Sequence, residues 1–297
     1  MTLFVSRFVP MVAVLAVAIA PLMILSAVLA PGQGRVFTDI GALFGAGPGT
    51  SAARTAAQAL QRDSASGGSL AFVLLASFAT RLLMWTAAAA YAAAAYAGRT
   101  MTLQEAYAVG LRRWFAQLLV GLAFAIIGGT MFVPLFIAYI LAFVVVGALI
   151  ALKLIVAAAI LGVIAAIVVL GVVVIAGAFV FMAYQLATVA VATNEPNPVT
   201  AISTSLRSVF ARATLWRTVV GGLVALAVTE GGTIPLVAVG GLLTALTHIG
   251  ALYYVVLGLG QVLLDGLVIA FVIVYAVDVR VRREGIDLLS LTQSPAV

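Results

Sequence analysis

The sequence predicts an all-α integral membrane protein with about six transmembrane helices. Of its 297 residues, 65% are hydrophobic and only 8% are charged. Soluble domains are about 45–50% apolar and about 25% charged. The apolar residues form runs of the roughly 20 residues that a helix needs to cross a hydrocarbon core of about 30 Å. This composition excludes a soluble enzyme, a disordered chain and a nucleic-acid-binding domain, and the lack of cysteine excludes disulfides.

The first two apolar runs predict a hairpin over residues 1–97. The first run, 8–30, is longer than the apolar core of a signal peptide, so we expect a retained helix. A polar stretch rich in Gly, Ala and Ser follows over 31–69, where we expect an extracytoplasmic loop. The second run, 70–97, is interrupted only by Arg81.

The remaining runs predict two more hairpins. Lys153 is the only charge between residues 115 and 192, and this block joins two segments on the same side of the membrane. It therefore contains two long or broken helices, giving six spans, or four short ones, giving eight. The last runs cover about 218–247 and 250–277. We expect a single membrane domain over 1–297, divided into the first hairpin 1–97, the second repeat 98–192, the third repeat 193–279 and a cytoplasmic tail 280–297.

The basic residues between the runs predict the orientation. Ten of the 15 lie on one side, before the first run and after the second run, the long block and the last run. Basic residues are enriched in cytoplasmic loops, which places both termini in the cytoplasm. Arginine near the inner leaflet attracts anionic lipid. The candidate lipid-facing residues are Arg112, Arg113, Arg207, Arg212, Arg280, Arg282 and Arg283.

Two cytoplasmic segments match each other at an offset of 95 residues and indicate an internal repeat. Residues 102–115 and 198–210 both have apolar positions at helical spacing, which predicts an amphipathic helix on the membrane surface. Thr102 and Glu105 have the spacing of a capping box, and Asn197 precedes a proline. The repeat unit is such a helix followed by a helical hairpin. A weaker third copy is indicated near the start of the chain.

Three segments carry a resemblance to a known family. They are QEAYAVGLRR at 104–113, ATNEPNPVTAISTSLRSVF at 192–210 and YAVDVRVRREGIDL at 275–288. Together they resemble the bacterial glycerophosphoryl diester phosphodiesterase membrane domains, over about 90–288. In the central segment Glu195 matches the family's acidic residue, but only Arg207 remains of its arginine pair.

The resemblance implies a multi-pass protein of the bacterial cytoplasmic (inner) membrane. The family name comes from chains in which this domain is joined to a soluble phosphodiesterase barrel. We expect no such barrel here, because the largest polar loop, 31–69, is too short to form one.

No residue pattern indicates catalysis or a cofactor. Phosphodiester hydrolysis needs metal-binding carboxylates and a general acid or base. The single histidine, His248, is expected at a turn between the last two runs. Metal-binding and nucleophile motifs are missing from the sequence. We therefore expect a protein that is not an enzyme and has no cofactor.

Ionisable groups at membrane depth are the main candidates for a site, because they are costly in lipid and normally face a partner, a cavity or water. Arg81 and Asp265 are predicted to lie about 18 and 22 Å from the outer surface. Gln261 is one helical turn from Asp265. We expect Arg81 to pair with Asp265 and to join the first hairpin to the third. A role in a substrate or proton pathway is the alternative.

Two other features bear on function. Glu230, followed by two glycines, indicates a broken helix within 215–247, and we expect a corresponding break within 115–150. Broken helices form binding sites in transporters. The alanine-rich run 87–97 predicts a close helix interface, either within the chain or with a protein partner or a second copy.

The leading functional hypothesis is a non-catalytic membrane scaffold or partner subunit that contacts anionic lipid and no nucleic acid. One alternative is a transporter or channel for a lipid or small amphiphile. Another is an accessory domain of a lipid-acting enzyme. A water-filled cavity that reaches Asp265 from either side favours transport, and a closed, fully packed core with an exposed small-residue face favours a scaffold.

Overall fold

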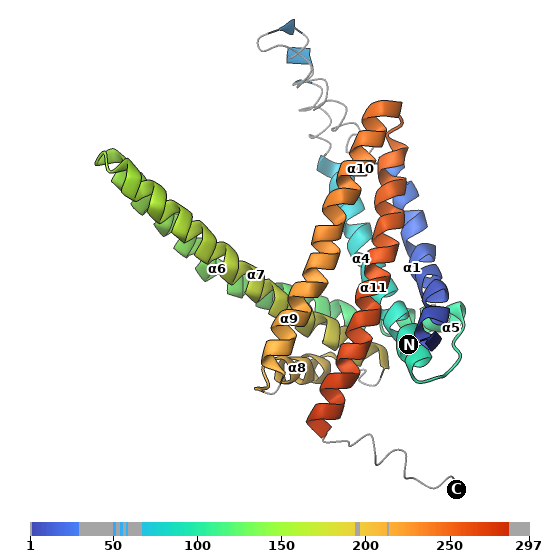
Figure 1. The fold of residues 1–297 in the computed structure, drawn as a ribbon. Helices are drawn as coiled ribbons and strands as arrows, with labels where there is room; N and C mark the ends of the chain where they lie inside the picture. Colours follow the sequence, from blue (N-terminus) through green and yellow to red (C-terminus); the bar gives the residue numbers. More distant parts are fainter. Residues whose placement is uncertain are drawn as a thin grey trace. The chain divides into compact units, whose positions relative to one another are not determined.

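The computed structural model describes residues 2–29, 50–51, 54–55, 58, 67–193, 197–212 and 214–284. Regular structure in these residues is entirely helical, which confirms the predicted class (Figure 1). The elements are α1 (Thr2–Leu29), α4 (Gly67–Tyr96), α5 (Leu103–Arg112), α6 (Trp114–Ala151), α7 (Ile155–Thr193), α8 (Pro198–Val209), α9 (Leu215–Leu226), η1 (Ala227–Gly231), α10 (Gly232–Thr247) and α11 (Ala251–Glu284). Most of loop 31–69, Glu195 and the tail after 284 lie outside the described residues.

Within the described residues, five helical segments are long and apolar enough to cross a membrane. They are Phe8–Val28, Trp114–Ala151, Ile155–Thr193, Leu215–Thr247 and Ala251–Val281. The block 115–192 therefore forms two long helices. Helix α4 has 30 residues and is about 45 Å long, which is enough to span the hydrocarbon core. We interpret α4 as the sixth predicted transmembrane helix. The total of six spans therefore stays a prediction.

Hydroxyl side chains in these helices bond to the backbone of their own helix. Ser26 donates to the carbonyl of Leu22 at 2.8 Å, and Thr86 donates to that of Leu82 at 2.8 Å. Hydrocarbon supplies no hydrogen-bond partner, so a hydroxyl there needs a partner in the protein. The carbonyl one turn earlier provides that partner and leaves the helix intact.

The predicted helix break within 115–150 is wrong, and the predicted break within 215–247 is a π-helical turn instead. Helix α6 continues through Pro134 over 38 residues, so 115–150 has no break. Segment Leu215–Thr247 contains the π-helical turn η1, which includes Glu230. A π turn adds a residue without ending the helix. Because lipid cannot satisfy free backbone groups, a bulge is less costly than a true break.

Contacts between the helices divide the chain into two compact units. Unit 1 contains residues 1–114 and 227–273, and unit 2 contains 115–226 and 274–297. In unit 1, α4 packs against α1 and α5; in unit 2, α7 packs against α8 and α9. Each unit thus combines helices that are distant in the sequence. The division into successive hairpins describes only the order along the chain.

The two surface helices begin at equivalent positions of the predicted repeat. Helix α5 follows the N-cap Thr102, and α8 follows the N-cap Asn197, 95 residues later. The same offset relates Ala106 to Ala201, and both alanines have no exposed surface. Thr102 and Glu105 form the predicted capping box, with the Thr102 N–H donating to the Glu105 carboxylate at 2.7 Å.

The hairpin turns keep the same 95-residue offset. Lys153 after α6 has φ 61°, and His248 after α10 has φ 58°. Both residues are in the left-handed region, which ends a helix and reverses the chain. Lys153 and His248 are therefore at hairpin turns, and for His248 this is the predicted position. These shared markers support a repeat of one surface helix followed by a hairpin.

Small residues allow the helices of each unit to approach closely. In unit 2, a Cβ added to Gly222 of α9 would lie 2.6 Å from the carbonyl oxygen of Ala178 in α7. In unit 1, a Cβ added to Gly110 of α5 would lie 3.0 Å from the carbonyl oxygen of Leu83 in α4. Residues Ala87–Ala90 of α4 are buried, so this part of the predicted small-residue face packs within the chain.

We expect Gly222→Ala to destabilise unit 2, because the new methyl group would clash with backbone that cannot rotate away. Overpacking of this kind costs about 1–3 kcal/mol. Gly171→Ala in α7 is the matched control, since a Cβ at this position meets nothing within 4 Å. Thermal unfolding in detergent should show a lower midpoint for Gly222→Ala alone. Equal midpoints for the two variants would contradict the close approach of α9 to α7.

We also expect the start of α5 to lose stability at low pH. The Thr102 N–H holds the pKa of Glu105 below its usual value of 4.5, with a further contribution from the Thr102 hydroxyl. A carboxyl whose pKa is lowered by folding stabilises the fold above its unfolded pKa, and this contribution is lost as the pH falls through the folded pKa. Amide hydrogen exchange, corrected for the intrinsic rate, should therefore increase at α5 as the pH falls below 4.5.

Helix α8 is the internal control, because its N-cap Asn197 is uncharged. Glu105→Gln should remove the pH dependence at α5. An equal response of α5 and α8, or an unchanged response in Glu105→Gln, would refute the assignment.

Candidate functional site

A cavity of about 180 Å³ lies among α1, α4 and α11 of unit 1. Arg81 of α4 and Gln261 of α11 both line it. Two of the three residues of the predicted intramembrane cluster therefore meet at one cavity, although they are distant in the sequence. The cavity lies within helices that we interpret as membrane spans.

The lining has an apolar part and a polar part. The apolar side chains are Ile19, Leu22, Met23, Val73, Met84 and Leu257. The polar side chains other than Arg81 and Gln261 are Ser26, Ser77, Thr80, Tyr253 and Tyr254. A ligand with an apolar chain and a polar head would match both parts. A purely polar ion would leave much of the wall without a favourable contact.

Asp265 lies one turn beyond Gln261 on α11 and is buried, with 5% of its surface exposed. Its Oδ2 has no hydrogen-bond partner within the described part of the chain. A buried, unpartnered carboxylate oxygen is costly. Asp265 does not itself line the cavity. It is the least well satisfied polar group near it.

Arg81 and Asp265 attract each other but do not form the predicted ion pair. The Arg81 charge acts on the Asp265 carboxyl. The one ion pair closer than 4.0 Å among the described residues joins Arg217 to Asp278 instead. The reason is positional, because Arg81 is exposed and lines the cavity whereas Asp265 is buried. The guanidinium of Arg81 therefore has no described carboxylate in direct contact.

The depth of these groups follows from the helix rise. Arg81 lies about 22 Å from the C-terminal end of α4, and Asp265 lies about 21 Å from the N-terminal end of α11. Both are thus near the middle of their helices. An ionised side chain at such a depth is expensive unless it meets a partner, a cavity or water. The cavity is the feature of unit 1 that meets this need for Arg81.

Glycines of α11 hold the walls of the cavity together. A Cβ added to Gly258 would lie 2.6 Å from the Met23 side chain of α1. A Cβ added to Gly266 would touch Leu15 of α1 at 3.5 Å. At Gly258 a larger residue would force the Met23 side chain to move, whereas at Gly266 a Cβ would make only an ordinary van der Waals contact. Because α11 packs close to α1, Gln261 of α11 lines the same cavity as residues of α4.

Sequence reasoning missed most of the polar lining, although a signal was present. In α4, Ser77, Thr80, Arg81 and Met84 are spaced i, i+3, i+4 and i+7, which places them on one helix face. In α11, Tyr253, Leu257 and Gln261 recur every fourth residue. Each helix thus presents one stripe to the cavity. The hydroxyl residues Ser77 and Thr80 lie on the same helix face as Arg81, so this spacing in the sequence was a usable signal.

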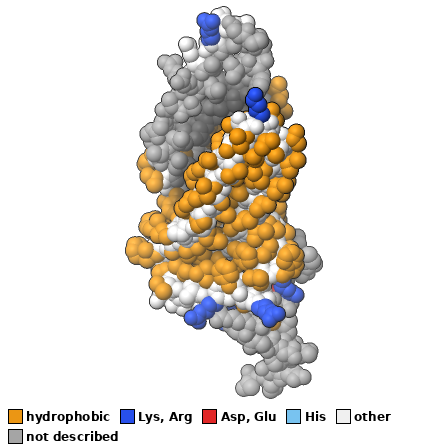
Figure 2. All heavy atoms as spheres, turned by 90° about the vertical axis from the view of Figure 1, so that its left-hand side faces the viewer, with side chains coloured by type: hydrophobic (Ala, Val, Ile, Leu, Met, Phe, Trp, Pro, Cys, Tyr) orange, Lys and Arg blue, Asp and Glu red, His pale blue; other side chains and the backbone are white. Residues whose placement is uncertain are grey.

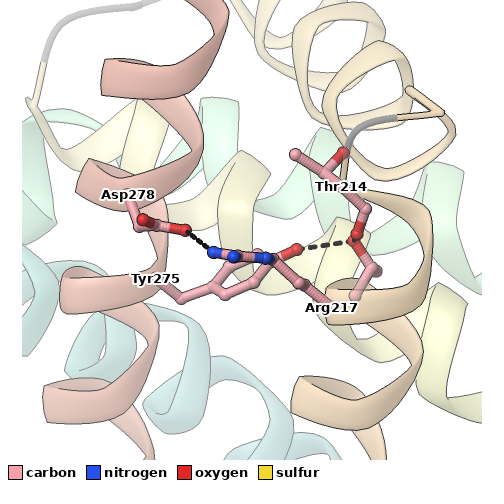
Figure 3. A network of polar contacts seen from close by, with 5 residues as sticks. Thr214, Arg217, Tyr275 and Asp278 are labelled. Carbon is pink, nitrogen blue, oxygen red and sulfur yellow. Dashed lines mark hydrogen bonds and ion pairs between the residues drawn. The ribbon is translucent and has the colours of Figure 1, made fainter.

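A second polar cluster joins α9 to the end of α11 in unit 2 (Figure 3). Arg217 Nη1 lies 3.2 Å from Asp278 Oδ2, and the side chains are 51% and 38% exposed. The Thr218 hydroxyl and the Tyr275 hydroxyl are 2.5 Å apart, and Thr218 has no exposed surface. Thr214 Oγ1 donates to the Ser208 carbonyl at 2.5 Å. The cluster fixes the contact between α9 and α11.

Most of the candidate lipid-facing arginines are accessible. Arg112 on α5 in unit 1 is exposed, as are Arg207, Arg212 and Arg280 in unit 2. Arg113 is half-buried, and the side chains of Arg282 and Arg283 lie outside the described residues. In Figure 2, hydrophobic side chains cover most of the described surface on this face, and Lys and Arg side chains lie at its margins. This pattern is typical of a membrane-embedded surface with charges near the headgroups.

The described residues contain no group of three or more His, Asp or Glu side chains that could hold a metal ion. His248 is exposed at the turn between α10 and α11. Its left-handed backbone ends α10, and its N–H donates to the Thr244 carbonyl at 2.8 Å. Its position at this turn matches the sequence prediction.

Comparisons with protein-family models, curated proteins and solved structures find no match to this chain. The resemblance to the glycerophosphoryl diester phosphodiesterase membrane domains stays a prediction.

We expect Tyr275→Phe to destabilise unit 2 more than Asp278→Asn. The tyrosine change removes a buried hydrogen bond, which contributes about 0.5–1.5 kcal/mol. The ion pair of Asp278 is exposed to a large extent, and such pairs contribute about 0–1 kcal/mol. Unfolding of both variants in detergent measures the order. Tyr139→Phe, at an exposed tyrosine of α6, controls for loss of a hydroxyl alone. The reverse order would show that the ion pair holds α9 to α11.

Proposed function

We propose that the protein is a non-catalytic, polytopic membrane protein that binds a lipid or small amphiphile in the unit 1 cavity, as the binding step of transport. The observation that carries this proposal is the composition of the cavity. Arg81 and Gln261 face a space whose other walls are largely aliphatic and hydroxyl side chains. Ligand sites in proteins commonly combine an apolar lining with a few convergent polar groups.

The cavity favours this function over a passive scaffold. A scaffold predicts a closed core and an exposed small-residue face available to a partner. Instead, Ala87–Ala90 of α4 are buried within the protein, and unit 1 contains a cavity. The cavity is lined by Gln261, one helical turn before Asp265, and does not reach Asp265 itself. Contacts with other proteins, or with a second copy, would have to use other faces.

Contact with anionic lipid at the inner leaflet is a second, compatible proposal. The exposed arginines Arg112 and Arg207 lie on the short capped helices α5 and α8. Each such charge contributes about 1 kcal/mol near an anionic surface. This arrangement supports a location in the bacterial cytoplasmic membrane with both termini in the cytoplasm. The family resemblance adds a third proposal, an accessory role beside a lipid-acting enzyme.

Filling the cavity tests the proposed function. We expect Ser77→Phe to remove most of the amphiphile that the wild-type protein retains or takes up, because the new ring would occupy space between α1 and α4. The measurement is lipid mass spectrometry of the purified full chain, together with the uptake of a spin-labelled fatty acid. Ser77 donates to the carbonyl of Val73 at 2.6 Å, so its loss leaves the helix backbone intact.

Thr130→Phe on α6 is the matched control, since Thr130 is exposed and also bonds to its own helix, at the Ile127 carbonyl. It should bind amphiphile like the wild type. Equal uptake by wild type and both variants would refute the cavity as the binding site.

A further inference from the structure

The geometry of the unit 1 cavity points to the class of its ligand: a single-chain anionic amphiphile whose headgroup binds Arg81, in competition with Asp265. This inference rests on the proposed amphiphile-binding function and deepens it. It has three parts, which concern the donors at the cavity, its size and the buried carboxylate beside it.

The cavity offers a strong hydrogen-bond donor to a ligand. Arg81 has five N–H donors and lines the space. It has no ion pair with any described carboxylate. Guanidinium groups bind carboxylate and phosphate through paired, charge-assisted hydrogen bonds. Gln261, on the opposing helix, adds an amide that can donate to the same headgroup.

A cationic headgroup does not fit this arrangement. It would meet Arg81 first, because Arg81 lines the cavity and Asp265 does not. Like charges at mid-membrane depth repel strongly, since little water screens them. A neutral headgroup could enter but would form no charge-assisted hydrogen bond with Arg81 of the kind that an anion forms. An anion is the one charge type that satisfies Arg81.

The cavity volume limits the size of the ligand. About 180 Å³ is smaller than the roughly 300–1,000 Å³ of pockets that enclose drug-sized ligands. The α1 stripe from Ile19 to Ser26 extends over only about 11 Å. This space suits a headgroup with part of one alkyl chain. It is too small for the two chains of a whole phospholipid.

Asp265 is the group that competes with the ligand headgroup for Arg81. It is buried, its Oδ2 has no partner among the described residues, and it lies one helical turn from Gln261, which lines the cavity together with Arg81. When the cavity is empty, Arg81 and Asp265 stabilise each other electrostatically. A bound anion interacts with the Arg81 guanidinium in place of Asp265, and Asp265 then loses part of this stabilisation. Asp265 therefore weakens anion binding, and a neutral residue at this position should strengthen it.

The test uses the purified full chain in a non-ionic detergent. Binding is measured by titration calorimetry with four ligands that share a twelve-carbon chain: dodecanoate, dodecyl phosphate, dodecanol and dodecyltrimethylammonium. We expect the two anions to bind about tenfold or more tighter than dodecanol, and the cation to bind weakest. A preference for dodecanoate over dodecyl phosphate assigns a carboxylate headgroup, and the reverse preference assigns a phosphate headgroup; both support the inference.

Variants at the two charges separate their roles. Arg81→Gln should abolish the preference for anions, and its unfolding midpoint in detergent shows whether the variant is folded. Arg81→Lys should keep part of the preference. Asp265→Asn should raise the affinity for both anions several-fold. Arg217→Gln, which removes an arginine outside the cavity, is the matched control and should behave like the wild type.

The failures of the two proposals are distinguishable. If all four ligands bind equally, or if the anion preference survives in Arg81→Gln, the headgroup assignment is overturned while amphiphile binding stands. If Asp265→Asn leaves anion affinity unchanged or lowers it, the competition is overturned. If no ligand binds and Ser77→Phe changes nothing, the proposed function itself fails.

Discussion

Hydrocarbon offers a polar group no hydrogen bond and solvates no charge, and the described structure follows from this constraint. Backbone groups are satisfied inside helices, and hydroxyls such as those of Ser26 and Ser77 bond to carbonyls of their own helix. The constraint also explains why the chain bulges at η1 and continues as a helix into α10. Against this background, a charge that lacks a direct partner is informative. Arg81 has none among the described residues, and it lines a cavity.

Close helix packing turns this constraint into a site. Apolar side chains gain little from leaving lipid for a protein core, so helices in membranes associate through tight contacts of small residues. Gly258 lets α11 approach α1, and Gly110 lets α5 approach α4. Where these contacts end, a space remains between the helices. Most of its polar lining comes from one face of α4 and one face of α11, so no single helix contains the site.

The sequence predicts those features that depend on local chemistry. The capping box at Thr102 and the turn at His248 need only neighbouring residues, and both are present in the structure. The membrane class and the two long helices of 115–192 follow from composition and length. The break expected in 115–150 was wrong because a proline alone does not open a helix in lipid. The contact of Arg81 with a cavity, and not with Asp265, depends on how three helices pack, which no local pattern encodes.

The positions of the charges argue for a site that releases its ligand. Arg112 is exposed on α5, which packs against α4, the helix that carries Arg81. A surface arginine such as Arg112 attracts anionic amphiphiles to the leaflet. Arg81, about 22 Å from the end of α4, would then be a second binding position near mid-membrane. A deep, uncompensated cation would hold an anion too tightly for passage. Transport requires binding that is favourable enough for entry and weak enough for exit. Under the proposed function, the buried carboxylate of Asp265 provides that moderation, a role that a passive scaffold does not require.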